Sequence, residues 1–308
     1  MPRIARLVMK GEPAVYHVIS RTALDGFVLG DVEKDHLLHL MRHLAAVYFV
    51  EVLGFCIMGN HWHLLVRMHT GEGVSDEEVR ERFRRCHGAT SKRAFTEGQI
   101  PLLREKWASL SEFVKDLKQT FSRWYNKTRG RRGFFWGERF KSVLVDTGDT
   151  LVNCLAYIDL NPVRAGMVGR PEEYRWCSLA YHVQTGNGGG FLSLDLGLRA
   201  FGSWDDRKRL RYYREYVYGI GSQRSTKGAK IDDRTMAREE KKGYELTAAD
   251  RLLFRTRYFT DSGVIGSKEF VSRCYRLFES HFTCRHEKRP RGVAGLEGVF
   301  SLKRLAGG

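Results

Sequence analysis

The chain has 308 residues, of which 42% are hydrophobic and 12% aromatic, a composition typical of a globular protein with one substantial core. Its 52 Lys and Arg outnumber its 36 Asp and Glu, so the formal net charge is +16 at pH 7. Such a basic balance predicts a polyanionic partner, either nucleic acid or an anionic membrane surface. No apolar run approaches the ~18 residues of a membrane-spanning helix, so nucleic acid is the favoured partner.

The cysteines are scattered along the chain and form no Cys-x-x-Cys pair. Free thiols in this pattern favour a reduced, cytoplasmic protein over a disulfide framework. The six residues are Cys56, Cys86, Cys154, Cys177, Cys274 and Cys284.

The first predicted elements are a strand and a helix. Residues 14–20 have an alternating pattern and contain β-branched side chains, which indicates a strand. Residues 32–49 carry leucines at helical spacing, and Asp31 is suited to cap the start of that helix.

Two further strands are predicted over residues 50–58 and 61–68, joined by the turn Gly59-Asn60. Successive side chains of a strand point to opposite faces, so His61 and His63 share one face. Two imidazoles on one face can hold a divalent metal together. The alternative is a pair of half-buried histidines satisfied by hydrogen bonds.

Between residues 76 and 110 the chain is highly charged and has little apolar periodicity, which predicts a solvated helical insertion. Residues 110–128 form a more clearly amphipathic helix. The stretch 129–141 follows, in which arginines precede Phe134, Phe135 and Trp136. Arginines contact phosphates and aromatic rings stack on unpaired bases, although the aromatics could instead plug the core.

After a fourth strand at 139–145, a short helix is predicted from Thr150 to about Asn161, where Pro162 limits it. Tyr157 and Asn161 are four residues apart and project from the same face. Tyr157 could therefore be a nucleophile with an oxygen ligand one turn away. The alternatives are a tyrosine at the edge of the core, or a different nucleophile at Tyr125.

The glycine-rich run 186–190 predicts a linker. It divides the chain into a catalytic domain at 1–185 and a basic, helical extension at 191–308. Within the extension, residues 246–282 allow two short helices, which would form either a DNA-binding unit or a plain packing element.

Three of these motifs together resemble the single-tyrosine HUH transposases, most closely the REP-associated tyrosine transposases of bacteria. They are the His61–His63 strand, the segment Trp136–Ser142 and the segment Tyr157–Ala165. The resemblance spans roughly residues 10–182. Two departures are the long charged segment before Leu110 and the large region beyond residue 190.

The resemblance implies an α/β fold: a ferredoxin-like or RRM-like antiparallel sheet with helices on one side, followed by the helical extension. It implies that His61, His63 and Asn161 bind Mg²⁺ or Mn²⁺ and that Tyr157 is the nucleophile. The product would be a 5′-phosphotyrosine link on single-stranded DNA with a free 3′-OH. This chemistry predicts a transposase that cleaves and rejoins DNA at hairpin-forming repeats, in a bacterial cytoplasm and close to the nucleoid.

The basic and aromatic residues near these motifs are the candidates for DNA contact. They are Arg131, Arg132, Trp136, Arg139, Lys141 and Arg164. A non-catalytic RRM-like nucleic-acid-binding protein and a metal-dependent phosphodiesterase that uses water remain alternatives. The sequence leaves open the DNA target, the preferred metal and whether the protein is a monomer or a homodimer.

Overall fold

The computed structural model describes residues 7–9, 11–88, 95–195, 205–223, 228–247, 250, 265–277, 279, 289–292, 298 and 300–302. The strands are β1 (Ala14–Arg21), β2 (Val50–Ile57), β3 (His61–Met68), β4 (Lys141–Val145), β5 (Ile265–Gly266), β6 (Arg291–Gly292) and β7 (Phe300–Ser301). The helices before β4 are α1 (Asp31–Ala45), α2 (Asp76–His87), the 3-10 helix η1 (Glu97–Gln99), α3 (Ile100–Trp107) and α4 (Leu110–Thr128). The later helices are α5 (Asp149–Asp159), α6 (Asn161–Arg164), η2 (Pro171–Glu173), α7 (Ser178–Thr185), α8 (Asp206–Ser222), α9 (Asp233–Lys241) and α12 (Lys268–Leu277).

A four-stranded sheet lies at the centre of the molecule, with the strand order β2-β3-β1-β4 and antiparallel pairing throughout. The chain order β1-α1-β2-β3-α4-β4 produces this arrangement when each helix crosses the sheet between non-neighbouring strands, as in ferredoxin-like folds. The predicted fold class is confirmed. The predicted fourth strand begins at Lys141, two residues later than expected.

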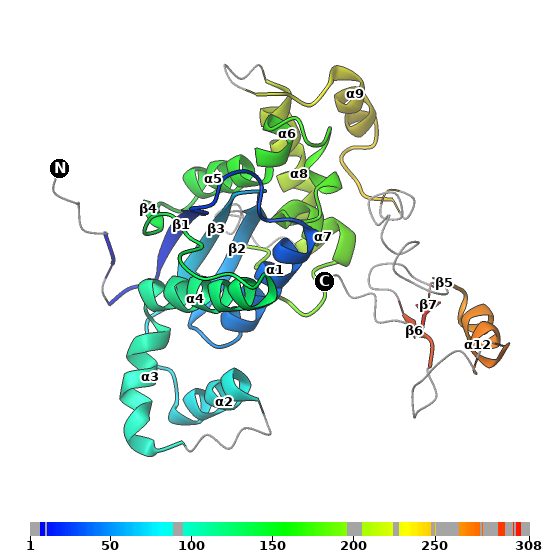
Figure 1. The fold of residues 1–308 in the computed structure, drawn as a ribbon. Helices are drawn as coiled ribbons and strands as arrows, with labels where there is room; N and C mark the ends of the chain where they lie inside the picture. The colour runs from blue at the N-terminus through cyan, green and yellow to red at the C-terminus, as the bar shows by residue number, and fades with distance from the viewer. Residues whose placement is uncertain are drawn as a thin grey trace.

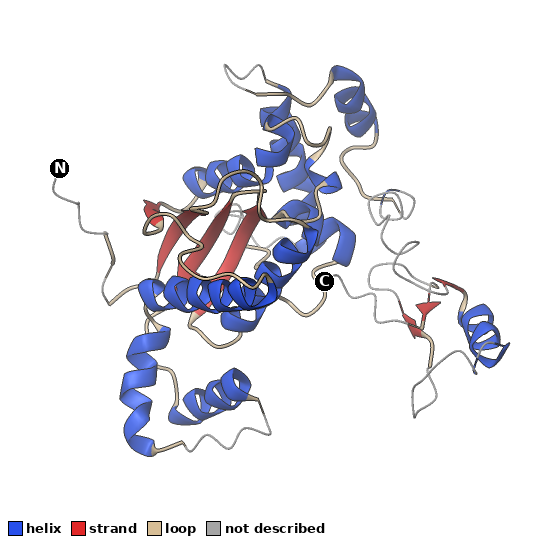
Figure 2. Ribbon diagram, viewed as in Figure 1, coloured by secondary structure: helices blue, strands red, loops and turns tan. Residues whose placement is uncertain are grey.

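Helices cover both faces of the sheet, which corrects the expectation of helices on one side (Figures 1 and 2). On one face the fully buried Trp62 contacts Trp136, which packs against Phe121 of α4. On the other face, α5 lies so close that a Cβ on Gly54 would be 2.1 Å from Leu155 Cδ1. The glycine of β2 therefore permits the approach of the helix that carries the predicted nucleophile.

The charged segment after β3 forms α2, η1 and α3, as the composition predicts. It is not fully solvated, because Val79 and Phe83 of α2 are buried in the main core. Arg82 also donates to the carbonyl oxygens of Val47 and Tyr48, which anchors the insertion beside the sheet.

The chain beyond the glycine run returns to the sheet. Leu192 forms a parallel bridge with Val52, and Ser193 N donates to the Val52 carbonyl at 2.8 Å, which covers the edge strand β2. Tyr213 and Val217 of α8 are buried in the same hydrophobic core as the sheet. The division into domains at 186–190 remains a prediction, but α8 packs as part of the central body.

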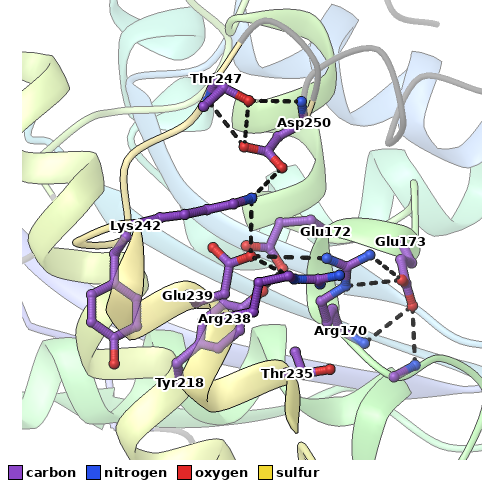
Figure 3. A network of polar contacts seen from close by, with 12 residues as sticks. Arg170, Glu172, Glu173, Tyr218, Thr235, Arg238, Glu239, Lys242, Thr247 and Asp250 are labelled. Atoms are coloured by element: carbon purple, nitrogen blue, oxygen red, sulfur yellow. Dashed lines mark hydrogen bonds and ion pairs between the residues drawn. The ribbon is translucent and has the colours of Figure 1, made fainter.

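A cluster of buried charges joins the parts of this region. Figure 3 shows Glu172 of η2 and Glu239 of α9 converging beside Tyr218 of α8. Tyr218 Oη donates to Glu172 at 3.0 Å, and Lys242 Nζ lies 3.6 Å from Glu239.

Most of the predicted unit at 246–282 lies outside the described residues. Its second helix is present as α12, with the Ser267 Oγ accepting from Phe270 N as predicted for a capping residue. Among the described residues, no helix is long and apolar enough to cross a membrane.

Because His182 of α7 is buried, we expect the folded protein to lose stability in acid. Burial lowers its pKa to about 4, and its Nε2 has no hydrogen-bond partner among the described residues. Below pH 6.5 His182 is protonated in the unfolded chain but stays neutral in the folded protein. The free energy of unfolding therefore falls as the pH falls toward 4. His182→Gln should reduce the loss between pH 7 and pH 5 by about 2 kcal/mol, measured by urea denaturation at each pH. An unchanged difference between the two pH values would contradict this prediction.

Candidate active site

Strand β3 places His61 and His63 on the same face of the sheet, as predicted. Their ring centroids are 5.1 Å apart, and Trp62 between them points into the core on the opposite face. His63 is buried and His61 is half-buried, so the pair lies at the margin of the core.

Helix α5 brings Tyr157 to the histidine pair. The ring of Tyr157 lies 5.9 Å from that of His63, edge to face, although the two residues are far apart in the sequence. The Tyr157 side chain is 44% exposed, so its hydroxyl remains accessible to a macromolecular substrate.

Asn161 lies one turn beyond Tyr157, at the start of α6. Helix α5 ends at Asp159, two residues earlier than predicted, and the chain continues through Leu160 in a helical conformation. Asn161 Nδ2 donates to the carbonyl oxygens of Tyr157 and Ile158 at 2.9 and 3.2 Å. These bonds orient the amide, so Oδ1 is the atom with which Asn161 would bind a metal.

Burial keeps the two imidazoles uncharged. Desolvation, with a smaller effect from Arg21, lowers the pKa of His61 to about 4. Desolvation, with smaller effects from His17 and His61, lowers the pKa of His63 to about 3. Both rings are therefore neutral at pH 7, which is the form that binds a metal.

The donor set fits a divalent cation that accepts mixed ligands. Two neutral imidazoles and an amide oxygen suit Mn²⁺ as well as or better than Mg²⁺, which prefers oxygen ligands alone. Within the described ranges, no three or more His, Cys, Asp or Glu side chains gather to hold a metal ion.

Three residues of the site were not identified from the sequence. His17 of β1 lies with Nε2 3.0 Å from His63 Nδ1, and Asn60 Oδ1 lies 2.7 Å from His61 Nδ1. Arg21 is the cross-strand partner of His61, so its side chain shares the histidine face. The alternation of β1 signals that His17 and Arg21 share a face, but not that this face meets the histidine pair.

The predicted phosphate contacts lie at different distances from the site. Arg164 places its guanidinium 5.2 Å from the centre of the Tyr157 ring. Lys141 is exposed and is paired with Ile19, itself the partner of His63, so it extends from the histidine face.

The remaining arginines lie in or just after the loop that follows α4. Arg132 and Arg139 are exposed, whereas Arg131 is half-buried and its Nη1 is 3.5 Å from Asn126 Oδ1.

The buried position of Trp136 contradicts the prediction that its ring stacks on DNA bases. The side chain is only 8% exposed, contacts Trp62 and Phe135, and donates from Nε1 to the carbonyl of Lys118. A large apolar ring gains more from this burial than from exposure, so the plug alternative holds for Trp136 and Phe135. Phe134 is 88% exposed and is the ring of this loop that offers a free face.

The fold and site define a ferredoxin-like domain that joins a histidine pair to a tyrosine. Residues 12–97 match the family described as "Transposase IS200 like". This segment contains β1 to β3 with both histidines, and it ends before Tyr157. The match confirms the resemblance to transposases that the motifs predicted.

Solved structures with partial similarity include two transposases. One is described as the "REP associates tyrosine transposase bound to a REP hairpin" and is 14% identical, covering 76% of this chain and 100% of its own, with a TM-score of 0.41. The other, a putative transposase from Deinococcus radiodurans R1, is 18% identical and covers 47% of this chain and 87% of its own, with a TM-score of 0.25. No curated protein matches the chain. TM-scores below 0.5 do not establish a shared fold, so the fold assignment depends on the strand order alone.

Proposed function

We propose that the protein is a metal-dependent transposase that cleaves and rejoins single-stranded DNA through Tyr157. The observation that carries this proposal is the contact of Tyr157 with His63, since it unites a nucleophile with half of a metal site. The match of residues 12–97 to IS200-like transposases supports the same class of enzyme.

The reaction would begin with attack of the Tyr157 Oη on the scissile phosphorus. A new O–P bond forms, the bond from phosphorus to the 3′ oxygen breaks, and the released 3′ oxygen takes up a proton. Mg²⁺ or Mn²⁺ held by His61, His63 and Asn161 would polarise a non-bridging phosphate oxygen. The Arg164 guanidinium beside the Tyr157 ring adds positive charge where negative charge develops. The free 3′-OH can later reverse the step on another strand, so rejoining needs no nucleotide cofactor.

The charge distribution suits a DNA strand that passes the histidine pair at the margin of the sheet, beside α5. Arg21 and Lys141 extend from the histidine face, and Arg164 flanks the tyrosine. Cations placed in this way neutralise phosphates on both sides of the scissile bond. Because the motifs resemble those of the REP-associated tyrosine transposases, we propose hairpin-forming repeats as the DNA substrate.

The RRM-like alternative is less well supported. An RRM binds RNA on an open sheet whose aromatic side chains stack on bases. Here α5 covers one face of the sheet and α4 the other, and Trp136 is buried. A pure binding module also has no need for Tyr157 beside two neutral histidines.

A covalent adduct is expected when the wild-type protein meets hairpin DNA and Mn²⁺. The probe is a pool of hairpin oligonucleotides with randomised single-stranded flanks, labelled either at the 5′ or at the 3′ end. Because Tyr157 would retain the 5′ phosphate, the 3′ label should remain with the protein on a denaturing gel, and the 5′ label should leave with the 3′-OH fragment.

EDTA should abolish the adduct, because the metal site would be empty. Cleavage without any adduct would instead indicate a phosphodiesterase that uses water. Binding that is indifferent to EDTA, with neither cleavage nor adduct, would indicate a binding module. Either result would refute the proposed function.

A further inference from the structure

Each histidine of the candidate metal site has its Nδ1 engaged by a neighbour. Asn60 Oδ1 lies 2.7 Å from His61 Nδ1, and His17 Nε2 lies 3.0 Å from His63 Nδ1. The metal chemistry proposed above uses His61, His63 and Asn161 as ligands and assigns no role to these two contacts.

The partner of one ring nitrogen decides what the other can do. A neutral imidazole carries one N–H and one lone pair, and only the lone pair can bind a metal. A carboxamide oxygen accepts hydrogen bonds but cannot donate them. His61 therefore donates from Nδ1 to Asn60, and its lone pair lies on Nε2.

The contact between His17 and His63 contains a single proton shared by two nitrogens. If the proton belongs to His63 Nδ1, the lone pair of His63 is on Nε2 and can bind a metal. If it belongs to His17 Nε2, then His63 carries its own proton on Nε2 and cannot bind. Both rings are buried, so water cannot readily replace either partner.

Both neighbours are held in place by the fold. The backbone of Asn60 is fixed because its carbonyl accepts from Thr22 N at 2.9 Å, next to the start of β3. On β1, Ile19 is paired with His63, which places His17 diagonally across from it on the same face.

We propose that Asn60 and His17 are positioning residues that hold His61 and His63 as Nδ1–H tautomers, so that both present Nε2 to a divalent cation. This inference rests on the proposed function for the identity of the site. The tautomers themselves, however, are a property of the metal-free protein and can be measured without catalysis.

The first test is the tautomer of each ring in the metal-free protein. Long-range ¹H–¹⁵N correlation spectra at pH 7 should show a protonated Nδ1 and an unprotonated Nε2 for both His61 and His63. In Asn60→Leu the His61 ring should lose this single tautomer, and in His17→Phe the His63 ring should do so. A protonated Nε2 on either wild-type ring would overturn the proposal.

The second test is the affinity for Mn²⁺ alone, measured by the electron paramagnetic resonance signal of the free ion. Loss of an outer hydrogen-bond partner of this kind weakens metal binding by about 10- to 100-fold, and we expect that range for Asn60→Leu and His17→Phe. Asn60→Asp keeps an oxygen acceptor for His61, and His17→Gln offers an oxygen acceptor in place of the imidazole nitrogen, so both should recover most of the affinity. His69→Gln, at the far end of the same sheet and 46% exposed, is the control and should bind as the wild type does.

The results separate this inference from the proposed function. A protein with both Nδ1–H tautomers that forms no adduct with DNA would refute the function and leave the inference standing. An active protein in which Asn60→Leu and His17→Phe bind Mn²⁺ as tightly as the wild type would refute the inference and leave the function standing.

Discussion

Replacement of Tyr157 by phenylalanine should abolish the covalent protein–DNA adduct. The change removes only the hydroxyl that would attack phosphorus, so adduct formation should fall by roughly 10³-fold or more. The measurement is the fraction of 3′-labelled hairpin DNA retained by the protein on a denaturing gel, with Mn²⁺ present. Because the side chain is 44% exposed, the free energy of unfolding should change by less than about 0.5 kcal/mol.

Tyr125→Phe is the matched control for this experiment. Tyr125 also lies near a basic loop, but it is buried against Phe121 and Phe135 and has no access to a DNA strand. This variant should form the adduct as the wild type does. Persistence of the adduct in Tyr157→Phe would show that another residue is the nucleophile, whereas loss in Tyr125→Phe alone would assign the role to Tyr125.

The sheet and the histidine face were predictable because strands have a strict period. Alternation in residues 14–20 and 61–68 specifies which side chains share a face, so His61 and His63 lie opposite Trp62, although helices bury much of both faces. The helical spacing of Tyr157 and Asn161 is equally local. The bonds from Asn161 Nδ2 to the carbonyls of Tyr157 and Ile158 are the direct result of that spacing.

The contacts that complete the site join residues far apart in the sequence, so the periodicity of single elements could not predict them. The position of His17 beside His63 depends on the pairing register of β1 with β3, which a single strand does not reveal. The approach of α5 depends on Gly54 opposite Leu155. A glycine within a strand indicates a close approach but does not identify the partner.

The position of Trp136 is a second feature that could not be predicted from the sequence. The composition of the loop after α4 is the same whether its rings face solvent or the core. Packing of Phe121 against Trp136 determines the outcome, and only Phe134 remains exposed. The packing of α8 against α5 could not be predicted from the sequence either, because α8 follows a glycine run that resembles a linker.

Helix α8 supports the candidate active site from behind. Its Tyr213 Oη donates to the buried Asp159 at 2.6 Å, two residues after Tyr157 on α5. Asp159 also accepts from Ser178 Oγ at 2.6 Å, which ties α7 to the same point. The position of Tyr157 therefore depends on α8 being held against the core.

Arg214 is the residue that holds α8 most strongly. Its side chain is 1% exposed, its Nε donates to Glu172 at 2.9 Å and its Nη2 donates to Glu239 at 2.9 Å (the carboxylates are seen in Figure 3). It also donates to the carbonyl of Tyr244. One arginine thus joins η2, α8 and α9, and it pairs with two carboxylates that have almost no contact with water.

Arg214→Met should lower the free energy of unfolding by about 3–5 kcal/mol, measured by urea denaturation at pH 7, because removal of one partner leaves buried charge uncompensated. Arg207→Met, on the same helix and 79% exposed, is the control and should change it by about 0–1 kcal/mol. If the charge is the cause, adding Glu172→Gln and Glu239→Gln to Arg214→Met should recover a large part of the loss.

A small effect of Arg214→Met would mean that α8 is held by its apolar contacts alone. A large one with a single unfolding transition would show that α8 unfolds together with the sheet, and that the region beyond the glycine run belongs to the body that positions Tyr157.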